Sequence, residues 1–169
     1  MHARTDVRTQ LSAILVAFFL VFVSLTSGKP ICFAADQGAK EGESITTMEL
    51  KLGNGTIKAV IADTPSSRER GLLGWQTIDD NTGMLLDFVF EGIYAIHMQG
   101  MKFPIDAVWI DSTGRVLLIY ENIQPNSGLT YPSLVRSRYC LELKAGSCKR
   151  LGVSMGEKVG FGRRDRTVP

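Results

Sequence analysis

The β character of this chain is clearest in the stretch Ile105-Asp106-Ala107-Val108-Trp109-Ile110. Five of these six residues are apolar, which is typical of a short strand buried on both faces. Residues 111–114 then read Asp-Ser-Thr-Gly, which favours a tight turn with Asp111 capping it, and residues 115–121 resume a strand pattern. The stretch therefore predicts a β-hairpin whose first strand is deeply buried.

Similar signals repeat on either side of this hairpin. Apolar and polar residues alternate at 46–52 and again at 57–61, and Gly53-Asn54-Gly55 lies between the two runs. Asn-Gly between such runs is a strong hairpin signal, because both residues tolerate positive φ. Further strands are predicted at residues 83–90, 93–98 and 139–143 and, after a turn, within 153–161.

Two short helices are expected among these strands. Residues 63–74 offer Asp63 or Thr64 as a cap, Pro65 for the first turn and Gly74 as an end, and residues 148–151 predict one further helical turn. Residues 122–133 are rich in Pro, Gly, Asn and Ser and predict a long surface loop. Together these elements predict a mainly β fold: a compact β-sandwich or barrel-like single domain with one or two short helices.

The N-terminal residues resemble an export signal. Arg4 and Arg8 precede an apolar run at residues 11–25, and Cys32-Phe33-Ala34 places small residues where a signal peptidase reads, so we expect cleavage after Ala34. An uncleaved membrane anchor is the alternative, because no charge interrupts the chain between Arg8 and Lys29. The remaining boundaries are a linker at 35–45, a β-rich domain at 46–162 and a basic tail at 163–169.

Charge narrows the range of partners. Removal of the first 34 residues deletes three of the 19 basic side chains and one of the 17 acidic ones, which leaves 16 of each in 135 residues. A neutral domain lacks the electrostatic footprint of a nucleic-acid-binding protein. We therefore expect an extracytoplasmic monomer, periplasmic or secreted, that contacts the membrane only through residues 11–25 if the signal is retained.

Cys140 and Cys148 are the two cysteines that survive removal of the signal. In an oxidising compartment such a pair is a disulfide candidate. Two buried free thiols are the alternative, because cysteine often packs as a small hydrophobic residue. The spacing matches neither a Cys-x-x-Cys redox motif nor a zinc site.

Three side chains are candidates for catalysis. His97 should lie on a strand, facing away from Ile96 and Met98, where it could act as a base, an acid or a metal ligand, or bond to a polar neighbour. Asp106 enters an apolar strand, so it needs a partner, and Arg70 is the one we expect. Glu142 lies between two leucines and is either buried in the same way or turned toward solvent.

The candidate binding residues are Arg70, His97, Met98 and Asp106. No pair of ligands has the spacing of a metal site, so no metal or other cofactor is expected. No serine lies in Gly-x-Ser-x-Gly, and no Gly-x-x-x-x-Gly-Lys motif is present to hold phosphates.

The order of motifs resembles a known family. Residues 70–74 read Arg-Gly-Leu-Leu-Gly, residues 83–86 read Gly-Met-Leu-Leu, and His97-Met98-Gln99-Gly100-Met101-Lys102-Phe103-Pro104-Ile105-Asp106 follows them. Ile110-Asp111, Gly114-Arg115-Val116 and Leu141-Glu142-Leu143-Lys144-Ala145-Gly146 complete the series, with Gly152 and Gly156 after it. Over about residues 46–162 the chain resembles the family catalogued as domain of unknown function 192, which is widespread in bacteria and archaea and often follows an export signal.

The resemblance implies a mainly β, sandwich-like domain without an assigned activity. The commonest family pattern has an aromatic pair before the methionine and Lys-Asn-Thr after it. Here Ile96-His97 and Gln99-Gly100-Met101 replace them, so no role of the usual tryptophan or lysine can be transferred.

Two functions fit the sequence. The first is an exported, non-catalytic ligand-binding or accessory module, in which loop 122–133 and segment 97–106 form a cleft for a small molecule or an envelope component. The second is a small hydrolase or lyase that uses His97 with Asp106 or Glu142. Whether His97 and a carboxylate converge in an open pocket distinguishes the two.

Overall fold

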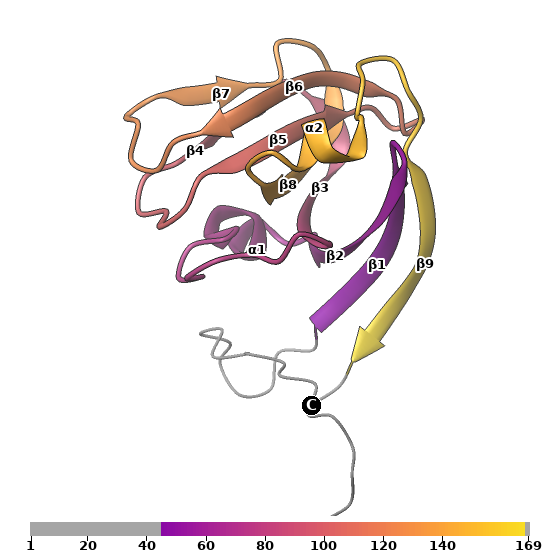
Figure 1. Ribbon diagram of the computed structural model, residues 1–169, viewed down its shortest axis with the longest axis horizontal. Helices are drawn as coiled ribbons and strands as arrows, with labels where there is room; N and C mark the ends of the chain where they lie inside the picture. The colour runs from indigo at the N-terminus through magenta and orange to yellow at the C-terminus, as the bar shows by residue number, and fades with distance from the viewer. Residues whose placement is uncertain (1–44, 168–169) are drawn as a thin grey trace, which may run out of the picture. The chain divides into compact units, whose positions relative to one another are not determined.

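The computed structural model describes residues 45–167, which form nine strands and two short helices (Figure 1). In chain order they are β1 Ile45–Leu52, β2 Gly55–Ala62, α1 Pro65–Arg70, β3 Thr82–Gly92, β4 Ala95–His97, β5 Ile105–Ile110, β6 Val116–Ile123, β7 Thr130–Pro132, β8 Ser137–Lys144, α2 Ser147–Leu151 and β9 Gly160–Thr167. The mainly β fold class is confirmed. The expected signal and the linker up to residue 44 lie outside the described residues, and no helix within 45–167 is long and apolar enough to cross a membrane.

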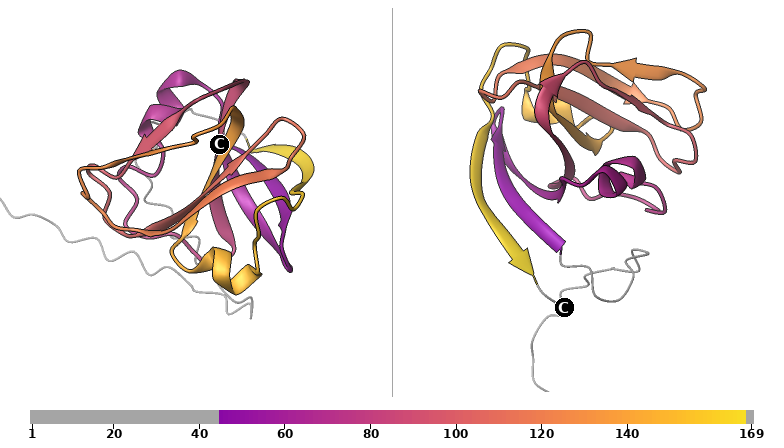
Figure 2. Two further views of the ribbon diagram at one scale, coloured as in Figure 1. Left: turned by 90° about the horizontal axis from the view of Figure 1, so that it is seen from above. Right: turned by 180° about the vertical axis from the view of Figure 1, so that it is seen from behind.

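Seven strands form one sheet in the order β6-β5-β8-β3-β2-β1-β9, and β4 pairs with β7 in a separate ribbon. All neighbours are antiparallel except β2 and β3, which α1 and the loop after it connect in parallel. The sheet is strongly coiled, so that β1 and β9 run at a steep angle to β5 and β6 (Figures 1 and 2). Because of this coiling, the strands of a single sheet surround much of the apolar interior.

The sheet has a hydrophobic core on each face. The α2-side core consists of Met48, Leu50, Leu52, Ile57, Ala59, Ile61, Leu85, Val108, Ile110, Val116, Leu141, Leu143, Cys148, Leu151 and Val159. The α1-side core consists of Ala62, Leu72, Ile78, Met84, Leu86, Ile96, Met98, Met101, Phe103, Ile105, Ala107, Trp109, Ile123 and Cys140. Alternate residues of β5 enter opposite cores, because successive side chains of a strand point to opposite faces. The expectation of a strand buried on both faces is therefore confirmed.

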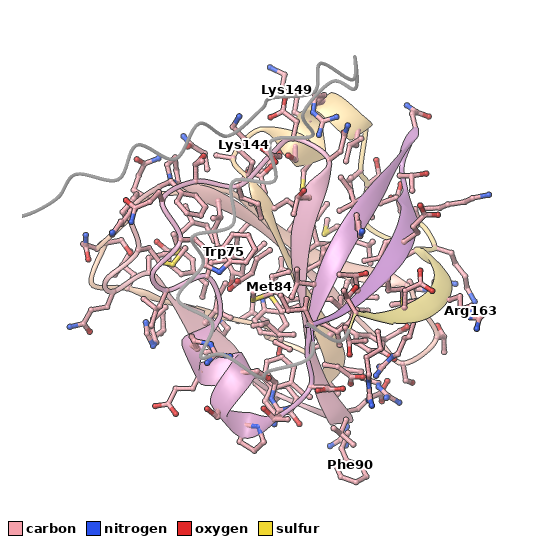
Figure 3. The ribbon with its side chains drawn as sticks, turned by 90° about the horizontal axis from the view of Figure 1, so that it is seen from below. Trp75, Met84, Phe90, Lys144, Lys149 and Arg163 are labelled. Carbon is pink, nitrogen blue, oxygen red and sulfur yellow. The ribbon has the colours of Figure 1, made fainter. Side chains whose placement is uncertain are left out.

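The two cores lie on opposite faces of the sheet. Figure 3 shows Met84 among the strands, Lys144 and Lys149 at the end that carries α2, and Phe90 at the opposite end. The α1-side core is the one that borders the pocket described below.

The first hairpin forms as expected but turns one residue earlier. Leu52 pairs with Gly55, so the turn residues are Gly53 and Asn54, and Gly53 has φ of 53°. A Cβ at Gly53 would overlap the carbonyl oxygen of Leu151, and the Asn54 amide donates to that oxygen at 2.8 Å. Contact with α2, which a local pattern cannot show, selects the register of this turn.

Several boundaries differ from the sequence prediction. The strand expected at 93–98 shortens to β4, and the loop expected at 122–133 contains the end of β6 and all of β7. Residues 163–167, expected in a basic tail, belong to β9, which pairs with β1 and stays exposed throughout. Edge pairing therefore extends the sheet into this segment.

The expected disulfide is wrong. Cys140 and Cys148 are both free and buried. Cys140 points into the α1-side core and Cys148 into the α2-side core, so the sheet separates the two sulfurs. A disulfide needs Cβ atoms about 3.8 Å apart, which this arrangement does not allow.

Candidate functional site

The local sequence around α1 sets one wall of a pocket. Thr64 accepts a hydrogen bond from the Ser67 amide at 3.1 Å, Ser67 Oγ accepts one from the Thr64 amide at 3.0 Å, and Pro65 follows the cap. This reciprocal capping fixes the start of a helix too short to be stable alone. The helix ends at Gly71, whose φ of 47° turns the chain so that Leu72 enters the α1-side core.

A pocket of about 190 Å³ lies between α1, the turn after it, β3, β4 and β8. Its apolar lining comes from Leu72, Leu73, Leu86, Phe88, Ala95, Ile96 and Met101. Its polar lining comes from Arg68, Glu69, Arg70, His97 and Glu142. We call this cavity the Glu142 pocket, because its one buried charged side chain is Glu142.

Glu142 is 7% exposed, and its Oε2 has no hydrogen-bond partner among residues 45–167. Leu141 and Leu143 point into the α2-side core, so strand alternation turns Glu142 toward the opposite face. Burial raises the pKa of Glu142 to about 7, because the charged form loses hydration without gaining a countercharge. A buried polar atom without a partner is rare in a native protein and suggests a group that a ligand completes.

His97 lies where the sequence predicts. Its side chain is exposed on β4, whereas Ile96 and Met98 on either side are buried. His97 lines the Glu142 pocket from β4, and it pairs with Thr130 of β7. The imidazole is therefore available at the pocket and is not sealed into the core.

An aromatic stack stiffens the wall of the pocket. Phe88 stacks on Tyr94 with ring centroids 3.9 Å apart, and Trp109 lies 6.0 Å from Phe88. The Arg68 guanidinium lies 5.6 Å from the Phe88 centroid, and its Nη1 donates to the carbonyl oxygens of Asp63 at 2.7 Å and Asp87 at 2.9 Å. These contacts of Arg68 therefore link α1 to β3.

Asp106 does not pair with Arg70, so that expectation is wrong. The carboxylate is fully buried and accepts hydrogen bonds from the backbone amides of Asn122 at 2.8 Å, Gly146 at 3.1 Å and Cys148 at 2.9 Å. Two of these donors belong to the start of α2, on the other face of the sheet from Arg70. Asp106 therefore caps α2 and closes the α2-side core, and it lies away from His97.

Where a cleft was expected, loop 122–133 is hydrogen-bonded directly to segment 97–106. The Asn126 amide donates to the Met98 carbonyl oxygen at 2.9 Å, and Asn126 Oδ1 accepts from the Gly100 amide at 2.8 Å. Met98 is 1% exposed and packs in the α1-side core. Of the four expected binding residues, Arg70 and His97 line the Glu142 pocket, whereas Met98 and Asp106 do not.

Sequence reasoning missed a third buried carboxyl group, Asp87. Its Oδ1 lies 3.2 Å from Arg138 Nε and its Oδ2 lies 2.9 Å from Arg164 Nη2. Burial alone would raise the pKa of Asp87, but hydrogen bonds from Arg138, the Val89 amide and Arg164 outweigh it and lower the pKa. An aspartate inside the apolar run 84–90 was a visible signal, yet its partners lie 51 and 77 residues away in sequence.

No group of three or more His, Cys, Asp or Glu side chains converges within residues 45–167 in a way that could hold a metal ion. The chemistry available in the Glu142 pocket is that of the buried Glu142 carboxyl group, the carboxyl group of Glu69, one imidazole and two arginines.

The fold and the site define a small, mainly β domain with a pocket lined by apolar and polar side chains. The chain belongs to the DUF192 family, described as an uncharacterized ACR, whose model matches residues 48–161. No curated protein matches the chain in sequence.

Two solved structures share the fold. One, a putative transcription regulator from Sinorhizobium meliloti, is 30% identical with a TM-score of 0.65, and the match covers 73% of this chain and 98% of that one. The other, a protein of unknown function from Novosphingobium aromaticivorans, is 23% identical with a TM-score of 0.63, and the match covers 69% and 84% of the two chains.

Proposed function

We propose that this protein is an extracytoplasmic, non-catalytic binding module that holds a small molecule in the Glu142 pocket. The observation that carries the proposal is the buried Glu142 carboxyl, whose Oε2 lacks a partner among the described residues while the side chain lines an open cavity. Isolated burial of this kind costs stability. A ligand group that bonds Glu142 would recover that cost on binding.

The composition of the pocket supports the same function. Ligand sites are mostly apolar with a few polar groups that fix orientation, and here leucines, Phe88, Ile96 and Met101 surround Glu142 and His97. The volume of about 190 Å³ lies below the roughly 300–1,000 Å³ of sites for drug-sized ligands. The ligand is therefore small. The extracytoplasmic location rests on the signal-like residues 1–34.

One observation favours a second candidate, a small hydrolase or lyase. His97 and Glu142 line the same pocket, and a carboxyl group with a pKa of about 7 suits general acid–base chemistry at neutral pH. In that case His97→Asn abolishes turnover without loss of fold, because His97 is exposed. A pure binding module retains its ligand affinity in this variant to within a few-fold.

A thermal-shift screen tests the binding function. Protein that begins at Ala35 is screened against small metabolites, and a ligand at about 100 times its dissociation constant should stabilise the fold by roughly 2.7 kcal/mol. Ala95→Trp fills the pocket from an exposed position of β4 and should remove the shift. Gln99→Trp, an exposed residue outside the lining, is the matched control and should preserve it. A shift that survives Ala95→Trp would place binding elsewhere.

A further inference from the structure

The deep end of the Glu142 pocket contains a carboxyl group without a countercharge. Its cross-strand neighbours are Met84 on β3 and Ala107 on β5, both apolar. The charged or titratable groups around the pocket are Arg68, Glu69 and Arg70 from α1 and His97 from β4, and Cys140 is the other titratable group nearby on β8. Burial raises the pKa of Glu142, and its Oε2 has no hydrogen-bond partner among residues 45–167.

We propose that the ligand of this pocket carries a small protonated amine, whose ammonium group pairs with Glu142 while its short alkyl part contacts the apolar wall. This inference rests on the proposed binding function and names the chemical class of the ligand.

The first argument is charge. An ammonium group donates three hydrogen bonds and brings the positive charge that the ionised carboxylate lacks. In a site of low dielectric such a pair attracts far more strongly than in water. An anionic ligand would instead require Glu142 to keep its proton, and the protonated Glu142 would offer it a single hydrogen-bond donor. A neutral amide would leave the carboxylate charge uncompensated.

The second argument is that one arginine of the pocket lining, Arg68, is already engaged. Arg68 donates to two backbone carbonyl oxygens and lies over the Phe88 ring, so its guanidinium is held at the aromatic wall. The approach to Glu142 is bordered by Gly71, where an added Cβ would lie 3.6 Å from Glu142 Oε2. Glycine at this point therefore adds no side-chain bulk beside the carboxyl group.

The third argument is the remaining lining. Leu72, Ile96 and Met101 provide an apolar surface next to the carboxyl group. A cavity of about 190 Å³ accommodates a short unbranched chain better than a ring system with many substituents. A primary alkylamine of about four carbons matches both the charge and the size of the site.

Three probes of equal size test the assignment: n-butylammonium, butyramide and butyrate. Their affinities for protein beginning at Ala35 are measured by calorimetry at about pH 6 and about pH 8. We expect n-butylammonium to bind at least tenfold more tightly than either of the others at about pH 8. Its affinity should fall roughly tenfold toward about pH 6, because a carboxyl group with a pKa of about 7 becomes mostly protonated, whereas the amine stays charged.

Glu142→Gln and Glu49→Gln form a matched pair of variants. Glu142→Gln preserves shape, and we expect it to lose at least tenfold in n-butylammonium affinity together with the pH dependence. Glu49 is exposed on β1 and does not line the pocket, so Glu49→Gln should retain both. Far-ultraviolet circular dichroism of each variant checks that the fold is intact.

Equal or tighter binding of butyrate or butyramide, sensitive to Ala95→Trp, would overturn the amine and leave the binding pocket standing. Affinity that rises toward about pH 6 would do the same. Absence of n-butylammonium binding at about 50 mM would also overturn the amine, and an inert metabolite screen in addition would remove the proposed function itself.

Discussion

Asp106 and Glu142 lie on adjacent strands but face opposite sides of the sheet. Asp106 is paired in register with Leu143 and Ala107 with Glu142, so the two carboxyl groups are one residue out of phase. Asp106 consequently meets the amides at the start of α2, whereas Glu142 meets the pocket beside α1. One carboxylate is satisfied and structural, and the other is the candidate for ligand contact.

Asp106→Asn should destabilise the fold strongly. The variant replaces one acceptor oxygen by an amide donor that faces backbone N–H groups, and hydrogen bonds to a charged group are worth about 1.5–3 kcal/mol each. We expect a loss of at least about 3 kcal/mol in urea unfolding. Asp165→Asn on exposed β9 should change stability by less than about 0.5 kcal/mol.

The effects of Asp106→Asn and Arg70→Met should add within about 0.5 kcal/mol, because the two side chains lie on different faces of the sheet. Measured coupling of about 1 kcal/mol or more would show that the residues communicate and would contradict the assignment of Asp106 to α2.

Glu142 should make stability fall as the pH rises. Its pKa is raised from 4.5 to about 7 in the folded state, so the folded protein binds more protons than the unfolded chain between these values. Ionisation of Glu142 does not change the free energy of unfolding below about pH 4.5, and it lowers this free energy by on the order of 3 kcal/mol above about pH 7. The difference in unfolding free energy between wild-type and Glu142→Gln protein should show this slope. A difference that does not vary with pH would contradict it.

Asp87 should act in the opposite direction. Its pKa is lowered in the folded state despite burial, through hydrogen bonds from Arg138, Val89 and Arg164, so it stabilises the fold above the ordinary value of 3.8. That stabilisation should be lost as the pH falls through the lowered pKa. Acid titration of wild-type and Asp87→Asn proteins should therefore converge at low pH and diverge near neutrality. Constant separation across the titration would exclude this role.

Both cysteines should react only after unfolding. Burial raises the pKa of the Cys140 thiol, and burial together with Asp106 raises that of Cys148, so little reactive thiolate forms. The measurement uses protein beginning at Ala35. Mass spectrometry after alkylation should show no added groups on the native protein and two on the same protein in guanidinium chloride. A loss of two hydrogens in non-reduced protein would instead reveal a disulfide.

The strands were predictable because their signals are local. Alternation at β1 and β2 and the apolar run of β5 specify both secondary structure and burial within a few residues. The placement of His97 on an exposed strand face followed from the same period of two. Boundaries were less predictable, since β7 and the end of β9 gain their hydrogen bonds from distant strands.

The sequence identified several residues of the candidate site but not how they are arranged. Arg70, His97 and Glu142 stood out as polar residues beside apolar ones, but their meeting in one pocket could not be read from the sequence. Asp106 was correctly expected to need a partner, and the partner proved to be backbone amides up to 42 residues away. A backbone amide carries no residue-specific signal, so no side-chain pattern could have identified it.

By itself the sequence determined the class of fold, the hairpins and which positions are apolar, because periodicity and turn chemistry act over a few residues. Only the tertiary structure decided which carboxylate is satisfied, which is left open in a pocket, and that the sheet keeps the two cysteines apart. These outcomes depend on the pairing of β5 and β8 and on which helix covers each face. A shift of one residue in that pairing would exchange the faces of the sheet, and no local pattern specifies it alone.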